Sequence, residues 1–410
     1  MYEAPSTIYV GEFQFPEGCA AALRVLGMGK ALREAGHRML FAGIEKKPRP
    51  QDRQPDGSFR YQGFPYFTRE YSGQGSLDRC KWFFQAHVGG NTTFERLNVL
   101  DLSAVKAIIA YHPSVTFLYR LMKFCRRRNI ALINDITEWH HPRHLPGKQL
   151  SPFYCSQEYR NRRLMPKVGN VIAISSYLEK YFLSRNCLTI RVPTLLDVAH
   201  AEPLPASEES RSDSDELRLV FTGSNLREKW EVIFDAMLQL KQAGRRVRLD
   251  VYGLARESFF HYLAPKARRL ADRLGDALII HGRVPREQYL RGVAEADFLV
   301  MLRDIEPWSQ ACFPTKFPEM MLQGLPLISN AHSDIGEYVR DGQEMLLVES
   351  PSVADLTRTL ERAMNLPRAE ISRMKAQARQ RVADCFDYHH YVGPLSDFIE
   401  KAVHKAGSKT

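Results

Sequence analysis

The sequence predicts an α/β protein built from two doubly wound, Rossmann-like domains that face each other across a cleft. Three observations predict this fold. The chain has 410 residues, which is more than one hydrophobic core usually serves. Short runs of Val, Ile and Leu alternate with segments of helical periodicity, as in buried parallel strands joined by helices. This alternation stops once, at a polar segment, and then starts again.

Residues 1–197 form the first predicted domain. The apolar runs at 7–11, 37–43, 105–111, 130–136 and 170–175 are expected strands. A helix is expected from about Cys19 to Glu34, because Gly36 is a usual C-terminal stop. Residues 46–75 are rich in Pro, Gly, Gln and Arg, so they are predicted to be a long insertion or mobile loop.

Residues 198–216, rich in Pro, Ser and Glu, are the predicted linker, and residues 217–385 form the second domain. Expected strands are the runs at 217–223, 247–253, 278–282, 298–303, 326–330 and 345–349. Helical periodicity lies between them, for example in the apolar face of Trp230, Ile233, Phe234, Met237 and Leu238. Residues 386–410 are expected to form a helix that packs back on the first domain.

The formal net charge of +10 is concentrated in clusters at 123–129, 159–167 and 245–248. Solvated helix faces are the favoured interpretation and peripheral contact with an anionic membrane is the second. Nucleic acid is not expected as a partner, because no reader motif accompanies the charge.

The expected location is the cytoplasm, including the inner face of the membrane. The seven cysteines contain no CxxC pair, which fits a reducing compartment. No apolar run approaches the ~18–20 residues of a membrane span, and the N-terminal residues lack the features of a signal peptide.

The stretch "CFPTKFPEMMLQGLPLISN" (312–330) is the most informative motif. A helix is expected to begin at Thr315, whose hydroxyl can cap it, and Pro318 is tolerated in its first turn. Lys316 and Glu319 share one face near the positive end of the helix dipole. Such a site fits a nucleoside diphosphate, with phosphates at Lys316 and ribose hydroxyls at Glu319. The alternative is a surface ion pair on an ordinary helix.

In each domain, a glycine-containing loop follows the first strand. Gly223 precedes Lys229 at the start of a helix, an arrangement in which backbone and lysine can both approach a phosphate, although many βα loops look alike. Gly11 and Gly18 flank the first loop of the chain without a GxGxxG fingerprint, so this loop is either a wall of the cleft or a simple tight turn.

The segment "INDITEWHHP" (133–142) places Asp135 and Glu138 after an apolar strand. Ionisable groups at the carboxyl end of a strand are candidates for catalysis or for positioning a substrate. A solvated turn is the alternative. The adjacent His140 and His141 lack the i, i+4 spacing of a helical metal site.

These motifs together resemble the retaining glycosyltransferases of family 4, which have the GT-B fold. The resemblance covers residues 9 to about 403, and its most specific part is "PTKFPEMMLQGLPLISN", which is similar to a signature of members that build surface polysaccharides. Further similar stretches are "EFQFPEGCAAALRVLGMGKALREAGH", "VIAISSYLEKYF" with "VPTLLD", and "HGRVPREQYLRGVAEADFLVMLR".

The resemblance implies transfer of a hexosyl or N-acetylhexosaminyl group from a nucleotide donor to a hydroxyl acceptor, lipid-linked or small, with retention of configuration. It implies that no metal or other cofactor is needed, because cations neutralise the leaving diphosphate. Residues 1–197 would hold the acceptor, with Glu138 first and Asp135 second as catalytic candidates beside the loop of Gly11 and Gly18. The implied donor-binding residues are Gly223, Lys229, Gly282, Arg283, Thr315, Lys316 and Glu319, with Gly282 and Arg283 beside the nucleobase.

Two positions depart from the family pattern. Ala311 stands near the place of a glutamate that contacts the sugar, which leaves Glu306 or Gln310 as substitutes. Ser224 stands where an arginine is frequent. These departures leave open a scaffold that binds nucleotide sugars without turnover. A nucleotide-sugar epimerase of the same architecture is the second alternative.

Overall fold

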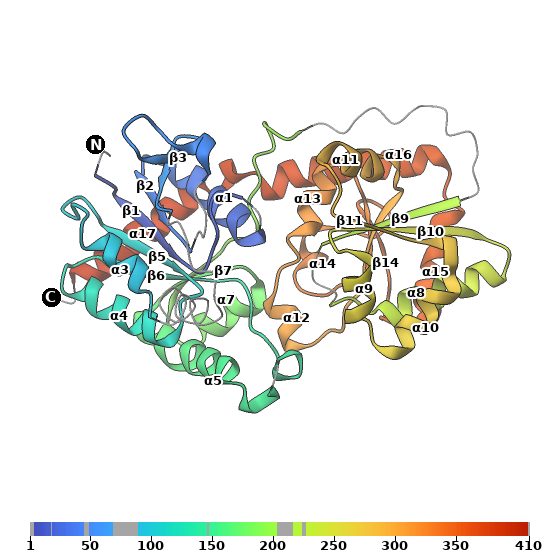
Figure 1. Ribbon diagram of the computed structural model, residues 1–410, viewed down its shortest axis with the longest axis horizontal. Helices are drawn as coiled ribbons and strands as arrows, with labels where there is room; N and C mark the ends of the chain where they lie inside the picture. Colours follow the sequence, from blue (N-terminus) through green and yellow to red (C-terminus); the bar gives the residue numbers. More distant parts are fainter. Residues whose placement is uncertain are drawn as a thin grey trace. The chain divides into compact units, whose positions relative to one another are not determined.

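The computed structural model describes residues 4–17, 19–44, 49–68, 89–145, 147–202, 216–223 and 227–408. The chain divides into two compact units (Figure 1). Unit 1 comprises Met1–Leu196, Ala311–Phe313 and Tyr388–Thr410, and unit 2 comprises Asp197–Gln310 and Pro314–Asp387. Each unit contains one mainly parallel sheet with helices, so the predicted α/β class with two Rossmann-like domains is confirmed.

The sheet of unit 1 has the strand order β3-β4-β2-β1-β5-β6-β7-β8. Its strands are β1 (Thr7–Gly11), β2 (Met39–Ala42), β3 (Phe59–Tyr61), β4 (Phe64–Tyr66), β5 (Ala107–Tyr111), β6 (Ala131–Ile136), β7 (Asn170–Ala173) and β8 (Leu188–Arg191). All neighbours are parallel except β3 and β4. Its helices are α1 (Ala20–Glu34), α3 (Asn91–Leu97), α4 (Val115–Arg126), α5 (Pro152–Tyr159), α6 (Met165–Val168), α7 (Ser176–Leu183) and α17 (Val392–Gly407).

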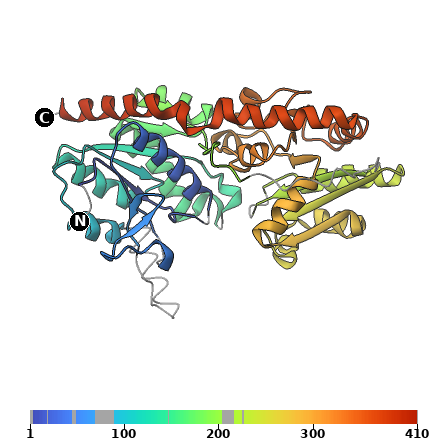
Figure 2. The same cartoon turned by 90° about the horizontal axis from the view of Figure 1, so that it is seen from above.

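The order of the strands places the helices of unit 1 on two faces. The chain moves from β1 through α1 to β2 in one direction and from β5 through α4 to β6 in the other. Because parallel crossovers are right-handed, α1 and α4 cover opposite faces of the sheet. The C-terminal helix α17 packs beside α1 and against β6 and β8 (Figure 2). Its buried face is Leu395, Phe398, Ile399 and Ala402.

The prediction of an insertion or mobile loop at residues 46–75 is wrong for its central part. Residues 59–66 form the antiparallel hairpin β3–β4, and β4 extends the parallel sheet by pairing with β2 through Phe41 and Tyr66. The ring of Phe64 packs against Phe41 with the centroids 5.4 Å apart, so aromatic contacts hold the hairpin to the sheet. Residues 46–48 and 69–75 lie outside the described part of the chain.

The sheet of unit 2 has the order β11-β10-β9-β12-β13-β14 and is parallel throughout. Its strands are β9 (Glu216–Thr222), β10 (Arg246–Tyr252), β11 (Leu278–Gly282), β12 (Phe298–Met301), β13 (Leu327–Ser329) and β14 (Met345–Leu347). Its helices are α8 (Trp230–Gln242), α9 (Arg256–Tyr262), α10 (Pro265–Leu274), α11 (Arg286–Glu295), α13 (Lys316–Leu322), α14 (Ile335–Tyr338), α15 (Val353–Met364) and α16 (Arg368–Phe386), while α12 (Pro307–Ala311) ends in unit 1. The strand order reverses between β9 and β12, which is the doubly wound pattern.

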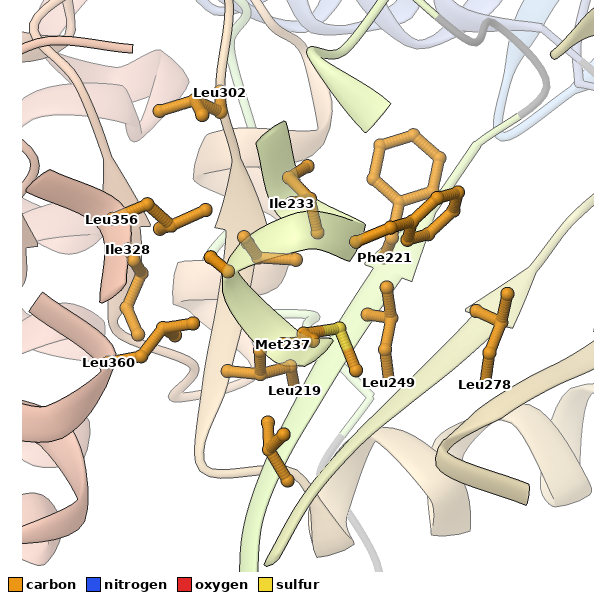
Figure 3. Close-up of a cluster of buried hydrophobic side chains, with 14 of the residues drawn as sticks. Leu219, Phe221, Ile233, Met237, Leu249, Leu278, Leu302, Ile328, Leu356 and Leu360 are labelled. Atoms are coloured by element: carbon orange, nitrogen blue, oxygen red, sulfur yellow. The ribbon is translucent and has the colours of Figure 1, made fainter. Parts of the chain in front are cut away.

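The predicted apolar face of the first helix of unit 2 is buried as expected. Trp230, Ile233, Phe234, Met237 and Leu238 all lie in the core. Figure 3 shows side chains of α8 such as Ile233 and Met237 among residues of β9, β10 and β11. The opposite end of the same core is formed by residues such as Ile328, Leu356 and Leu360 (Figure 3).

A buried ionic network lies within the core of unit 1. The guanidinium of Arg24, on α1, donates three hydrogen bonds of 2.7–3.0 Å to the carboxylate of Asp135 on β6. It also donates to the carbonyl oxygens of Val192 and Pro193 at 2.9 and 3.1 Å. The hydroxyl of Tyr9 donates to the same carboxylate. One network therefore joins α1, β1, β6 and the segment after β8.

We expect Arg24→Met to lower the free energy of unfolding by about 3–5 kcal/mol, because the Asp135 carboxylate would remain buried without its counter-charge. Arg33→Met, on the exposed side of the same helix, is the matched control and should cost less than about 1 kcal/mol. Chemical denaturation measures both. A loss for Arg24→Met no larger than that of the control would contradict the structural role of the network.

Candidate functional site

The point where the strand order of unit 2 reverses brings Lys229 next to Asp304. β9 ends before Gly223, and residues 302–304 follow β12. The backbone N–H of Lys229 donates to the carbonyl oxygen of Leu302 at 2.7 Å. Its Nζ atom donates to Oδ1 of Asp304 at 2.9 Å. Lys229 is the residue directly before α8, so its charge lies at the edge of the sheet where doubly wound folds bind ligands.

A buried glutamate fixes this junction. Glu228 accepts hydrogen bonds from the backbone N–H of Leu302 at 2.9 Å and from Nε of Arg303 at 2.8 Å. The backbone of Arg303 is further held by the side-chain amide of Asn330, which accepts from its N–H at 3.1 Å and donates to its carbonyl oxygen at 2.8 Å. Sequence reasoning missed Glu228 and Arg303, although Glu228 directly precedes the selected Lys229. Ser224 lies outside the described part of the chain.

Three neighbouring glycines form the carboxyl edge of β9, β10 and β11. Gly223, Gly253 and Gly282 all have positive φ angles, of 143°, 109° and 74°. The N–H of Gly253 donates to the carbonyl oxygen of Gly282 at 2.8 Å. A Cβ atom on Gly253 would lie 2.7 Å from the carbonyl oxygen of Gly223, so only glycine fits there. Sequence reasoning selected Gly223 and Gly282 and missed Gly253, although a glycine ends each of the three strand motifs.

Aromatic side chains link this glycine edge to Lys316. The rings of Tyr252 and His281 are stacked with the centroids 4.4 Å apart, and Tyr289 packs edge-on against Tyr252. The hydroxyl of Tyr289 donates to Sδ of Met320, on α13, at 3.3 Å. Burial raises the pKa of Tyr289, and the nearby charge of Lys316 opposes that rise. Arg283 follows β11 directly and is exposed.

Lys316 and Glu319 form an ion pair across the first turn of α13, with Nζ 2.7 Å from Oε2. Burial lowers the pKa of Lys316, but the charge and hydrogen bond of the Glu319 carboxylate, together with Tyr289, raise it, and the net shift is upward. The lysine is therefore charged at neutral pH. The expected cap at Thr315 is wrong, because its hydroxyl makes no capping bond and its backbone is already helical. With only seven residues in α13, the full charge of Lys316 outweighs the helix dipole as an anion attractor.

Both lysines are therefore bound by carboxylates that a ligand could replace. The side chains of Lys229 and Asp304 are 35% and 37% exposed, and those of Lys316 and Glu319 are 40% and 22% exposed. Ion pairs with this much solvent contact contribute about 0–1 kcal/mol. Hydrogen bonds to charged groups such as phosphates contribute about 1.5–3 kcal/mol. The balance favours exchange of the carboxylate for a phosphate.

The corresponding edge of unit 1 contains Gly11 and His112. A Cβ atom on Gly11 would lie 2.1 Å from the carbonyl oxygen of Tyr111, so the close approach of β1 and β5 requires glycine. His112 follows β5 with a φ angle of 44°, a left-handed conformation that is uncommon for residues other than glycine. Gly18 lies outside the described residues.

Sequence reasoning also missed His112, whose ring accepts a hydrogen bond from the backbone N–H of Thr137 at 2.9 Å. The hydroxyl of Thr137 lies 2.7 Å from the same Nε2 atom. Burial, with Arg160 nearby, lowers the pKa of His112 to about 3, so the imidazole is neutral. Glu138 follows Thr137, and its Oε1 atom lies 3.3 Å from Nε2 of His140. Glu138 is partly exposed and keeps its place as a candidate.

Asp135 requires a correction, because the structure gives it a structural role instead of the predicted catalytic one. Its side chain is fully buried, and both carboxylate oxygens are bound by Arg24 and Tyr9. A carboxylate held in this way has no access to a substrate.

Ala311 is buried, and its carbonyl oxygen accepts a hydrogen bond from Ser175 at 3.2 Å. Two residues were considered as substitutes for the carboxylate that is absent at this position. Glu306 accepts a hydrogen bond from the indole N–H of Trp308 at 2.9 Å, and Gln310 is partly buried.

Among the described residues, no group of three or more His, Cys, Asp and Glu side chains could hold a metal ion.

The neutral state of His112 predicts a loss of stability on acidification. The unfolded chain takes up a proton near pH 6.5, whereas the folded state leaves His112 neutral until about pH 3. Stability is therefore complete above pH 6.5 and falls by about 2 kcal/mol between pH 6.5 and 5. His112→Asn, which tolerates a left-handed backbone, should lose this component. Urea unfolding at pH 7, 6 and 5 measures the free energy of unfolding of both proteins. An equal decrease of this free energy with falling pH in the wild type and in His112→Asn would contradict the prediction.

Comparison with known proteins is consistent with these two units. The family model described as "Glycosyl transferases group 1" matches residues 216–365, which lie in unit 2 except for Ala311–Phe313. No curated protein matches the chain in sequence.

Solved structures match almost the whole chain. Sucrose-phosphate synthase from Thermosynechococcus elongatus has a TM-score of 0.68 at 15% identity and covers 97% of this chain and 98% of its own. HepE from Anabaena, in complex with UDP and glucose, has a TM-score of 0.66 at 15% identity with coverages of 97% and 100%. The catalytic domain of starch synthase IV from Arabidopsis thaliana, bound to ADP and acarbose, has a TM-score of 0.67 at 12% identity with coverages of 98% and 100%. At these identities the likeness concerns the fold. The chain thus has the GT-B fold, and its residues 216–365 match the model of the group 1 glycosyltransferases.

Proposed function

We propose that this protein is a glycosyltransferase that moves a hexosyl or N-acetylhexosaminyl group from a nucleoside-diphosphate donor to a hydroxyl acceptor, with retention of configuration. The observation that carries the proposal is the match of residues 216–365 to group 1 glycosyltransferases. The same part of the chain holds Lys229 and Lys316, whose carboxylate partners a phosphate can replace. Synthesis of a surface polysaccharide or glycoconjugate is the proposed setting.

Unit 2 is proposed to bind the donor. Gly223, Gly253 and Gly282 leave the backbone uncovered at the strand ends, where a nucleotide can approach closely. Lys229 and Lys316 would exchange their carboxylates for the diphosphate, and Glu319, once released, could accept hydrogen bonds from ribose hydroxyls. Two cations in place of a metal ion can stabilise the leaving diphosphate electrostatically.

Unit 1 is proposed to bind the acceptor, a lipid-linked or small molecule with a free hydroxyl group. Glu138, partly exposed beside the neutral His112, is the proposed group that orients or deprotonates this hydroxyl. Among the described residues, no helix is both long and apolar enough to cross a bilayer.

We expect Lys229→Ala and Lys316→Ala each to weaken binding of a nucleoside diphosphate by about 1.5–3 kcal/mol, because each removes a charged donor to phosphate. Isothermal titration calorimetry with UDP, GDP and ADP measures the dissociation constants. Lys266→Ala removes another exposed lysine of unit 2 that pairs with a carboxylate, Glu231 at 3.8 Å, and should leave the constants unchanged. Unchanged constants in both test variants would remove the two lysines from the donor site.

The transferase activity itself is tested by release of nucleoside diphosphate from a panel of donors with and without candidate acceptors. We expect acceptor-dependent release that is unaffected by EDTA, and NMR of the product should show the donor's anomeric configuration. Glu138→Gln should reduce the rate by about 100-fold or more with little change in donor affinity, as for loss of an acid–base group.

Two other results would point to the alternatives. Tight donor binding with no turnover across a broad acceptor panel would favour a non-catalytic scaffold, which the buried Ala311 motivates. A new sugar formed without acceptor would favour an epimerase.

A further inference from the structure

The positive charge of the chain is concentrated in two segments of unit 1. Residues 115–129 and 147–168 hold ten Lys and Arg residues and a single acidic residue, Glu158. They account for nearly all of the formal net charge of +10. Glu158 is bound by Arg162 at 2.6 Å, so it does not neutralise the other cations.

These segments form one surface of unit 1. Helix α4 packs against α5 and against the π-helical turn Arg160–Leu164, and α4 and α5 lie on the same side of the sheet (Figure 1). The side chains of Arg126, Arg127, Arg163 and Lys167 are exposed. We call this surface, formed by residues 115–129 and 147–168, the α4–α5 face.

The two segments of the α4–α5 face also expose large apolar side chains. Leu150 is 88% exposed, and Phe153, in the first turn of α5, is 50% exposed. Tyr159 at the end of α5 and Tyr119 on α4 are also half exposed. Cations together with exposed apolar and aromatic groups are typical of surfaces that bind lipid bilayers.

We infer that the α4–α5 face docks on the surface of an anionic lipid bilayer. Arg126, Arg127, Arg163 and Lys167 would lie against headgroup phosphates, while Leu150 and Phe153 would enter the boundary between headgroups and acyl chains. A nucleic acid would attract the same cations but would leave Leu150 in water, so the bilayer accounts for both features. The inference rests on the proposed function in one respect, since a bilayer is where a lipid-linked acceptor resides.

The test uses the full chain and sedimentation with vesicles of phosphatidylcholine, with or without phosphatidylglycerol. We expect binding to the anionic vesicles only, and weaker binding at high salt because electrostatic attraction is screened. The double variant R126Q/R127Q should weaken binding about 25-fold, since each cation near an anionic surface contributes about a factor of five. R245Q/R246Q, which removes two arginines from unit 2, is the matched control and should bind like the wild type.

The apolar contribution is tested separately with L150S/F153S, which should weaken vesicle binding by at least about tenfold. Val99→Ser removes another highly exposed apolar side chain of unit 1, outside the α4–α5 face, and should have no effect. All of the altered side chains are exposed, so each variant is expected to keep the fold. Circular dichroism of each variant checks this expectation.

Three results would overturn the inference: no binding to anionic vesicles, full binding by L150S/F153S, or equal losses for R126Q/R127Q and its control. Retention on RNA that depends on Arg126 and Arg127, without vesicle binding, would also overturn it. Nucleoside diphosphate release with a soluble acceptor should be unchanged in R126Q/R127Q. Failure of vesicle binding with intact transfer therefore refutes only the α4–α5 face, and intact vesicle binding without transfer refutes only the proposed reaction.

Discussion

The reversal of strand order between β9 and β12 is the constraint on which the site in unit 2 depends. Because crossovers are right-handed, the chain leaves these two strands toward opposite faces, and the backbone at their carboxyl ends stays uncovered. Gly223 lies on one side of this point and residues 302–304 lie on the other. The backbone hydrogen bond from Lys229 to Leu302 joins the segment that follows β9 to the segment that follows β12. The fold itself therefore brings a lysine to the place where a phosphate can bind.

Burial decides what an ion pair can do in this protein. Arg24 and Asp135 are both buried and saturated with hydrogen bonds, so separating them would leave a charge in the core. The pairs Lys229–Asp304 and Lys316–Glu319 have similar distances but remain in contact with water. Such pairs keep the lysines ordered at little energetic cost, and a more strongly charged partner can displace the carboxylate.

Most strands and the two-unit organisation could be predicted from the sequence, because apolar runs and helical periodicity are local signals. Gly223 and Gly282 were found in the same way, since each ends an apolar run. The role of Asp135 could not be found, because its partner Arg24 is 111 residues away and nothing local distinguishes it from Glu138. The hairpin at 59–66 was missed because its Pro- and Gly-rich surroundings indicate a loop, whereas packing of Phe64 on Phe41 stabilises strands there.

Positive charge has two different arrangements in this protein, one in unit 2 and one in unit 1. At the proposed donor site each lysine has its own carboxylate, so that site adds no net charge to the protein. The formal charge of +10 must therefore come from elsewhere, and residues 115–129 and 147–168 account for nearly all of it. Balanced pairs suit a site that exchanges one anion for another, whereas an unbalanced surface suits attraction to an extended anionic partner. The same residue types thus serve a local site in unit 2 and a broad face in unit 1.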